Sequence, residues 1–445
     1  MRRRFAGLLL GLPLLASAEL ARELPVPGGQ WTRDRQPVNT LIAPAEHLTR
    51  AEELDFYTGM SFFRSPWVTA PSSTTARDGL GPLFNAHSCE GCHPNGGRGP
   101  SLLDRPDSVA TVVRLSIETK RGEVAHPFYG DQIQTRAVWP DGWEAKVSLT
   151  STELPRRLTE DEQMILRQPT LGLSWGPAGD PGEILTSVRV PPPLIGLGLL
   201  ESISDGQIQA LEDVEDANND GISGRVHWRP LAGTDQIAVG RFGWKGMHPT
   251  VNQQVAAAFR DDLGITTPLS RGSVCALEQT RCAEMPNGND PVEGVEIVQL
   301  LFDYVTFFTR HIPPPSAGKL SERAALGQRL FREVQCDGCH QPSFTTSEGT
   351  FWPYTDLLLH DMGEELADGR REGDADGREW RTPPLWGIGT MKKVAGHTTL
   401  LHDGRARNVT EAILWHGGEA ASSRARFQAL PRDSQRALVV YVNAL

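Results

Sequence analysis

The sequence is short of three features. Its 445 residues include only six cysteines, too few for a disulfide-dense scaffold. Basic residues are in the minority, 44 against 55 acidic ones, and the net charge is −11. Nucleic-acid binders need a basic face to neutralise phosphates, so we expect no nucleic-acid partner. Beyond residue 18 no apolar run is long enough to span a bilayer, and we expect peripheral membrane contact or none.

Residues 1–18 have the pattern of a cleaved export signal. Three arginines (MRRR) precede an apolar stretch, FAGLLLGLPLLAS, which ends at Ala16-Ser17-Ala18. A membrane anchor is the alternative, but the stretch is short and contains Pro13. Cleavage before Glu19 would change the net charge from −11 to −14. We expect a periplasmic protein, whose cysteines can be oxidised or covalently modified.

Two of the three cysteine pairs have the spacing C-x-x-C-H. They are Cys89, Cys92 and His93, and Cys336, Cys339 and His340. This spacing is typical of c-type haem attachment, in which two thiols one helical turn apart reach the vinyl groups and the adjacent histidine ligates iron. A redox dithiol or a four-cysteine zinc site would leave both histidines unexplained. The sequence therefore predicts two covalently bound haem c groups.

The two motifs belong to an internal repeat. Residues 83–93 are LFNAHSCEGCH and residues 330–340 are LFREVQCDGCH. The motifs lie far enough apart for two separate haem domains. The remaining pair, Cys275 and Cys282, has no neighbouring histidine. In an oxidising compartment we expect it to form a disulfide, with two free thiols as the alternative.

We predict a mainly α fold with two cytochrome c-type domains and a loop-rich insert carrying some β structure. The boundaries are 1–18 for the signal peptide, 19–312 for the N-terminal haem domain with its insert, and 313–445 for the C-terminal domain. Helices are expected around 49–63 and 292–310 and a strand at 108–119. Pro313-Pro314-Pro315 would end the second helix.

The C-terminal part has helical patterns on both sides of its haem motif. Leu326, Leu330, Phe331 and Val334 share a helical face before the motif. Asp433 can cap a final helix with an apolar face. We expect these two helices to cross beside the haem.

The sixth ligand of each iron decides whether a haem transfers electrons or reacts with a small molecule. After His93 no histidine occurs until His126, and no methionine until Met164. We therefore predict that the N-terminal haem is five-coordinate or weakly ligated and is the reactive one. His126, His227 and His248 remain candidates for its sixth ligand.

The C-terminal haem has more candidates: His360, Met362, Met391, His397, His402 and His416. Asn408 or Thr410 can cap a helix that places His416 on an apolar face, where an unpartnered imidazole is costly. We favour His416 as the sixth ligand, since iron would satisfy the ring. The alternative is a histidine at a helix C-terminal dipole.

A separate stretch resembles a calcium loop. Asp216, Asn218, Asp220 and Gly221 match positions 1, 3, 5 and 6 of an EF-hand-like loop, but His227 stands where Glu is expected. A bound Ca²⁺ and an Asx-rich surface turn are equal alternatives.

Five longer segments together resemble the bacterial di-haem oxidoreductase family with C-x-x-C motifs, which is regarded as peroxidase-like. They are GLGPLFNAHSCEGCH (79–93), GRFGWKG (240–246), YTDLLLHDMG (354–363), EWRTPPLWGIG (379–389) and LLHDGRARNVTEAILWHGGEA (400–420). The chain is more distantly similar to the di-haem cytochrome c peroxidases. In these relatives the N-terminal haem meets peroxide and the other passes electrons.

The resemblance also implies individual residues. The relatives' methionine ligand, fourteen residues after a motif histidine, would fall on position 416, which supports His416 and implies bis-histidine ligation at a lower potential. Their distal Gln and Glu, ten residues apart, correspond to Gln134 and Glu144. Their inter-haem tryptophan is missing near Val124.

The leading hypothesis is a periplasmic di-haem c oxidoreductase, peroxidase-like, with Gln134 and Glu144 as catalytic residues. A small periplasmic donor protein would supply electrons to a small-molecule oxidant. The alternative is an electron-transfer cytochrome in periplasmic metal redox or uptake, for example of iron. Modification of a partner protein ranks third, because relatives of that kind use a tyrosine where this chain has His416.

Overall fold

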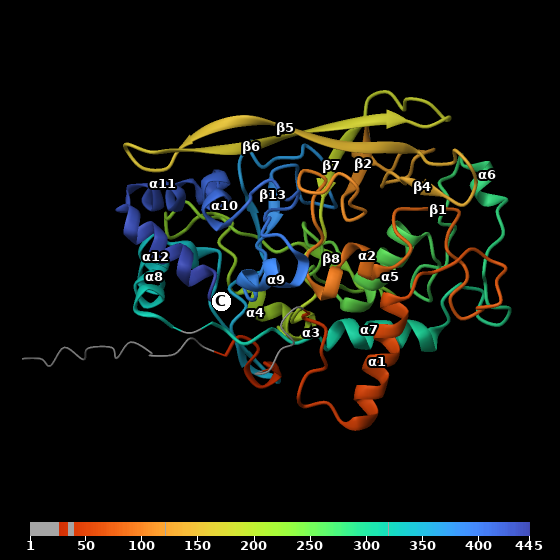
Figure 1. The fold of residues 1–445 in the computed structure, drawn as a ribbon, viewed down its shortest axis with the longest axis horizontal. Coiled ribbons are helices and arrows are strands. Elements are labelled where there is room, and N and C mark those ends of the chain that lie inside the picture. Colours follow the sequence, from red (N-terminus) through yellow and green to blue (C-terminus); the bar gives the residue numbers. More distant parts are fainter. Residues whose placement is uncertain (1–25, 34–39, 121, 319) are drawn as a thin grey trace, which may run out of the picture.

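The computed structural model describes residues 26–33, 40–120, 122–318 and 320–445 (Figure 1). The predicted export signal lies outside the described residues. The α-helices are α1 (Arg50–Arg64), α2 (Cys89–Cys92), α3 (Leu197–Ser202), α4 (Asp205–Gln209), α5 (Val251–Leu263), α6 (Thr280–Ala283), α7 (Gln299–Arg310), α8 (Glu322–Glu333), α9 (Met391–Ala395), α10 (Val409–Trp415), α11 (Ala421–Ala429) and α12 (Arg432–Val442). The strands are β1 (Leu83–Phe84), β2 (Val112–Thr119), β3 (Gly122–Val124), β4 (Arg136–Ala137), β5 (Ala145–Arg157), β6 (Gln163–Trp175), β7 (Leu185–Arg189), β8 (Trp228–Pro230), β9 (Ile237–Val239), β10 (Phe344–Thr346), β11 (Gly349–Phe351), β12 (Leu359–Asp361) and β13 (Glu379–Arg381).

The prediction of a mainly α fold is wrong. Helices account for 29% of the residues and strands for 19%, and the strands form several small antiparallel sheets. The largest departure is the β5–β6 hairpin, whose two strands have 13 residues each. Much of its surface is exposed, so its apolar residues alternate over short stretches only, and sequence periodicity did not reveal it.

The β5–β6 hairpin extends along one side of the molecule, over both halves of the chain (Figure 1). At one end Val147 and Leu171 pack against the cluster around Leu115 and Tyr129. At the other end Leu166 is buried in the core of the C-terminal half. The hairpin therefore belongs to the packing of both halves, although it lies within the segment expected to be loop-rich.

Local signals in the N-terminal half are largely confirmed. Thr49 caps α1 by accepting from the backbone N–H of Glu52, close to the predicted start of the helix. The predicted strand at 108–119 is β2, which pairs with β7 and β3. The helix expected over 292–310 begins only at Gln299, because the preceding residues form turns. Cys275 and Cys282 form the predicted disulfide.

In the C-terminal half, α8 packs against α12 as the apolar patterns on both sides of the second motif predicted. Gly327 of α8 lies against the backbone of Ala437, where a side chain would clash. Asp433 does not cap α12; it lies in the first turn, and Pro431 precedes the helix. The two main core clusters both take residues from either side of the proline run at 313–315. The domain boundaries stay predictions.

No helix of the described residues is long and apolar enough to cross a membrane.

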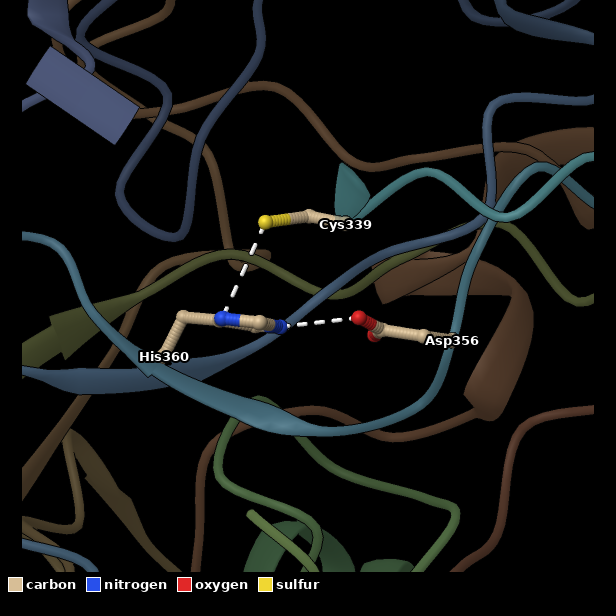
Figure 2. A group of neighbouring side chains, drawn as sticks. All are labelled: Cys339, Asp356 and His360. Carbon is tan, nitrogen blue, oxygen red and sulfur yellow. Dashed lines mark hydrogen bonds and ion pairs between the residues drawn. The ribbon is translucent and has the colours of Figure 1, made fainter. Parts of the chain in front are cut away.

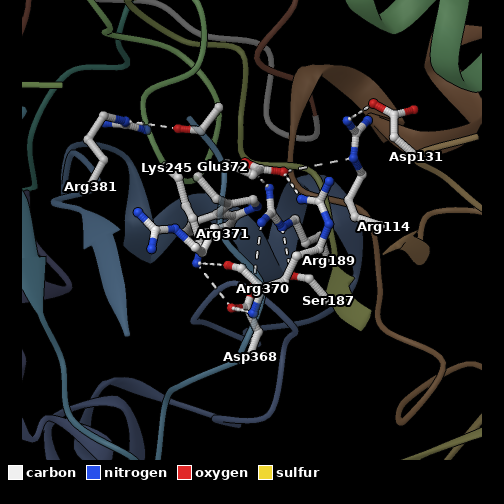
Figure 3. Close-up of polar contacts among 12 residues, drawn as sticks. Arg114, Asp131, Ser187, Arg189, Lys245, Asp368, Arg370, Arg371, Glu372 and Arg381 are labelled. Carbon is white, nitrogen blue, oxygen red and sulfur yellow. Dashed lines mark hydrogen bonds and ion pairs between the residues drawn. The ribbon is translucent and has the colours of Figure 1, made fainter. Parts of the chain in front are cut away.

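A buried ionic cluster joins the sheet of the N-terminal half to the segment 368–372 (Figure 3). The Glu372 carboxylate accepts from Arg189 of β7 at 2.9 Å and from Arg370. Asp368 accepts from the buried ammonium of Lys245 at 3.0 Å. Burial alone would raise the pKa of the Glu372 carboxyl, but the guanidinium groups of Arg189, Arg114 and Arg370 hold it well below its usual range. Glu372 therefore connects segments far apart in the sequence through ion pairs.

We expect Glu372→Gln to lower the free energy of unfolding by about 3–5 kcal/mol, because it leaves buried guanidinium groups without their counter-charge. Urea unfolding of the variant checks this. Glu364→Gln is the matched control, since Glu364 pairs with Arg378 at the surface and should cost about 1 kcal/mol or less. Equal losses of unfolding free energy in the two variants would contradict the role of Glu372 in connecting these segments.

Candidate functional site

Both C-x-x-C-H motifs open onto one cavity of about 730 Å³. Cys89 and Cys92 lie in the short helix α2, while Cys336 begins a 3₁₀ turn and Cys339 follows it. All four cysteines are free and line the cavity. Burial raises the pKa of the Cys89 and Cys336 thiols to about 12. Neither is therefore a ready thiolate, which argues against a redox dithiol.

The histidine of each motif presents a free nitrogen to the cavity. The Nδ1 of His93 lies 3.0 Å from the carbonyl oxygen of Pro192, and the Nδ1 of His340 lies 3.0 Å from that of Tyr354. A carbonyl can only accept, so Nδ1 carries the proton and Nε2 keeps its lone pair. Burial lowers the pKa of both rings to about 4. Both are neutral imidazoles held as iron ligands require.

His416 has the same arrangement. It lies at the C-terminal end of α10, a helix that Asn408 caps as predicted. Its Nδ1 donates to the carbonyl oxygen of Ala412 at 2.6 Å, which leaves Nε2 free, and the ring lines the cavity. Its position contributes to the lowered pKa of His340 through their charges. His416 and His340 therefore adjoin the same part of the cavity, and the role of His416 as sixth ligand stays a prediction.

Two other histidines proposed for the second iron, His360 and His397, have polar partners for both ring nitrogens. His360 lies between two carboxylates, with Nε2 2.8 Å from Asp356 and Nδ1 2.7 Å from Glu419. Figure 2 shows it between Asp356 and Cys339, a group whose atoms are of metal-binding types. His397 bonds through one nitrogen to the carbonyl oxygen of Arg98 and through the other to Thr399.

Three further candidates line the cavity, and the Nε2 of one of them, His402, lies 4.0 Å from the Asp403 carboxylate. Met362 and Met391 belong to its walls. His402 does too, and its ring stacks on Trp380 with centroids 3.8 Å apart and planes 9° apart. The cavity thus offers methionine sulfur and a stacked imidazole besides His416.

On the N-terminal side only one of the three candidate ligands reaches the cavity. His126 accepts two backbone N–H groups through Nδ1, from Phe128 and Tyr129. His227 uses both ring nitrogens, with Lys245 and Asp374. His248 lines the cavity, and its ring makes no hydrogen bond within the described part of the chain. Burial lowers its pKa to about 4, so it is a neutral imidazole with a free lone pair.

The predicted catalytic pair does meet, but outside the cavity wall. Glu144 accepts from the backbone N–H of Gln134 at 2.6 Å and from the side chain of Gln279. Neither Gln134 nor Glu144 is among the lining residues, whereas Gln132 and Asp262 are. The Asp262 carboxylate accepts from the Gln132 amide at 2.8 Å, and burial raises its pKa to about 6.

Sequence reasoning missed several lining residues, including Gln132, Asp262, Arg98, Arg381, Trp244 and Trp380. Trp244 and Trp380 lie within the segments GRFGWKG and EWRTPPLWGIG, which carried the family resemblance. No spacing rule connects them to the haem motifs, so sequence alone could not assign them. Trp139 and Trp143 do not line the cavity; they lie beside Arg281 and Lys146.

The loop proposed to bind calcium is a turn held by its own side chains. The Asp216 carboxylate accepts from the backbone N–H groups of Asp220 and Gly221, and Asn218 also accepts from Asp220. Asp220 in turn accepts from Ile222. These are Asx-type bonds, and His227, at the twelfth position, has its partners elsewhere. A Ca²⁺ ion here stays a prediction.

The cavity residues suit two haem groups. There are two pairs of free thiols, and three lining imidazoles have Nδ1 bonded to a backbone carbonyl, which leaves Nε2 for a ligand. Apolar side chains such as Phe63, Val305 and Leu385 complete the walls. Haem would contribute redox-active iron, held by the motif histidines and joined to the cysteines through thioether bonds.

Glu144 should make stability depend on pH. It is 4% exposed, and burial raises its pKa from 4.5 to about 8. Below pH 4.5 this carboxyl is protonated in both the folded and the unfolded protein and does not affect stability. Between pH 4.5 and pH 8 it ionises only in the unfolded protein, so the folded state is increasingly destabilised as pH rises. We expect the free energy of unfolding of Glu144→Gln to exceed that of the unmodified protein by a margin growing ~1.4 kcal/mol per pH unit across this range. Urea unfolding at pH 5 and pH 8 measures it.

Glu153→Gln, at an exposed position of β5, is the control and should leave the pH profile unchanged. Parallel profiles for Glu144→Gln and the unmodified protein would show that the Glu144 carboxyl is not shifted.

The family model described as "Di-haem oxidoreductase, putative peroxidase" matches residues 28–116 and 181–445. The unmatched stretch contains β5, β6, Gln134 and Glu144, so the match does not bear on that pair. No curated protein matches. Among solved structures, hydrazine synthase from Kuenenia stuttgartiensis, studied under xenon pressure, is 13% identical over 100% of both chains with a TM-score of 0.37, too low to support an argument.

Proposed function

Because the chain belongs to the di-haem oxidoreductase family, we propose that it is a periplasmic di-haem c enzyme with peroxidase-like activity. Its N-terminal haem, at Cys89, Cys92 and His93, meets the oxidant. Its C-terminal haem, at Cys336, Cys339 and His340, receives electrons from a small donor protein and passes them on. Hydrogen peroxide is the oxidant that the family description favours.

One observation supports different roles for the two haems. The C-terminal part of the cavity has two histidines, His340 and His416, each with Nδ1 bonded to a carbonyl and Nε2 free. Two imidazoles would close both axial positions of an iron, which suits electron transfer at a potential lower than histidine and methionine give. Among the described histidines that line the cavity, His93 has no second imidazole bonded to the backbone in this way beside it, which supports a more open N-terminal site.

The N-terminal part of the cavity carries groups that can handle protons. Asp262 and Gln132 line the cavity as a hydrogen-bonded pair, and Asp262 has a pKa of about 6. A carboxyl with a pKa near neutrality can accept a proton from a bound oxidant and return it. Glu144 and Gln134 form a second layer, in which the Gln134 amide donates to the backbone carbonyl of Asp261. We assign proton transfer to Asp262 and support of the wall to Glu144.

A second candidate function has an observation in its favour. His248 lines the cavity with a neutral ring that has no hydrogen-bond partner among the described residues. Ligation by His248 would close the N-terminal iron too. The protein would then be an electron-transfer cytochrome, for example one acting on a metal ion such as iron, and the net charge of −14 expected after cleavage suits a cationic substrate.

The spectra of the haem-loaded protein separate these functions. We expect two covalent haems, one high-spin and reactive with peroxide and one low-spin, seen by optical and EPR spectroscopy. His416→Ala should convert the low-spin haem to high-spin, because it removes one axial ligand. His397→Ala is the control, since both nitrogens of His397 are bonded elsewhere.

An unchanged spectrum in His416→Ala would contradict the ligand assignment. Two low-spin haems without peroxide turnover, even after pre-reduction, would favour the electron-transfer function. Protein without haem would contradict both functions.

Export has its own test. We expect the protein recovered from the periplasm to begin at Glu19, as N-terminal sequencing would show, because Ala16-Ser17-Ala18 is a cleavage site of the usual type. Retention of Met1 on cytoplasmic protein would contradict the location. It would also count against haem c attachment, which we place in the same compartment.

A further inference from the structure

Two arginines of the cavity wall lack the partner that buried arginines usually have. Six arginines of the described residues are buried, and four of them, Arg189, Arg241, Arg370 and Arg405, have a carboxylate within 4 Å. Arg98 and Arg381, which are 5% and 6% exposed, have none in the part of the chain that the structure describes. Both line the cavity.

The protein satisfies only part of each guanidinium group. Arg98 donates through Nη2 to the carbonyl oxygen of Leu401, and its Nε is buried without a partner. Arg381 donates through Nε to Gly243 and through Nη1 to Thr382. A guanidinium has five N–H donors, so both have donors left for a ligand in the cavity.

The two groups flank the same short segment. The Arg98 guanidinium lies over the ring of Trp244, 5.2 Å from its centroid. Arg381 bonds to the carbonyl oxygen of Gly243, and its backbone N–H donates to that of Trp244. Arg98 follows His93 of the first motif by five residues. Arg381 pairs across the strands with Leu359, whose neighbour His360 contacts Cys339 of the second motif. The pair thus lies where the wall connects the two haem motifs.

The nearest acidic groups do not neutralise these cations. Asp403, beside Arg98, is paired with Arg405 at 2.8 Å. Asp356, beside Arg381, is paired with His360 at 2.8 Å. Burial lowers the pKa of both arginines only to about 10, so both stay charged at neutral pH. An unpaired buried charge is costly, and an occupant that brings carboxylates would remove that cost.

We propose that Arg98 and Arg381 bind haem propionate carboxylates in this cavity and thereby orient the two haems. The proposal rests on haem binding, which belongs to the proposed function. Haem is largely apolar and carries its two propionate carboxylates at one edge. It therefore matches a cavity with apolar walls and two guanidinium groups that have donors free. Arginine is suited to the task, because its planar donors match a carboxylate.

The experiment measures the midpoint potential of each haem between pH 5.5 and 8.5 by optical redox titration, after haem content has been determined. We expect Arg98→Gln to retain two haems and to lower one midpoint potential, since a positive charge near the iron favours the ferrous state. That potential should also fall as pH rises, because a propionate without its cation has a higher pKa and titrates in this range. Arg98→Lys, which keeps the charge, should restore most of the potential.

Arg407→Gln is the matched control. It removes the same charge from a half-exposed arginine that pairs with Glu411 outside the cavity wall, and should leave both potentials unchanged. Arg381→Gln provides a second variant, with the same expected shift, if Arg98→Gln does not fold. Two haems with unaltered potentials and pH profiles in both cavity variants would overturn the propionate assignment alone. Absence of haem from the unmodified protein would overturn it together with the proposed function.

Discussion

The buried carboxylate of Glu372 makes the ion pairs on which the placement of the two C-x-x-C-H motifs around one cavity depends. It accepts from Arg189 and Arg370, while Asp368 next to it accepts from Lys245 (Figure 3). The strand β7 that carries Arg189 leads into residues 190–193, which include the carbonyl bonded to His93. The segment 368–372 precedes β13, which pairs with β12 beside the second motif. These buried charges are satisfied by one another and by backbone carbonyls, and they connect segments from both halves of the chain.

The cavity combines three kinds of polar group in mainly apolar walls. Neutral imidazoles bonded to backbone carbonyls keep a lone pair on the other nitrogen, four free thiols line the walls, and two arginines with no carboxylate partner in the described part of the chain supply positive charge. Each would be unfavourable in an empty apolar space. Together they are complementary to one cofactor class, which matches the family to which the chain belongs.

Local sequence patterns predicted the structural features that depend on residues close together in the sequence. The capping of α1 by Thr49 and of α10 by Asn408, and the disulfide between Cys275 and Cys282, depend on residues a few positions apart. The fold class failed, because the β5–β6 hairpin is stabilised by contacts with cores far away in the sequence. The pair Gln134 and Glu144 was chosen by a spacing of ten residues. That spacing agrees with a hydrogen bond from the backbone N–H of Gln134 to the Glu144 carboxylate, but it could not show that Gln132 and Asp262 form the wall.

The sequence by itself predicted two haem-attachment motifs, because covalent attachment requires two thiols and a histidine at fixed spacing. It also singled out His416 and the resemblance to the family. Only the tertiary structure decided which distant side chains share the cavity. His248 reaches it while His126 and His227 bond elsewhere, and Arg98 and Arg381 line it without a carboxylate partner among the described residues. The reason is physical: whether a buried polar group is satisfied depends on partners from other parts of the chain.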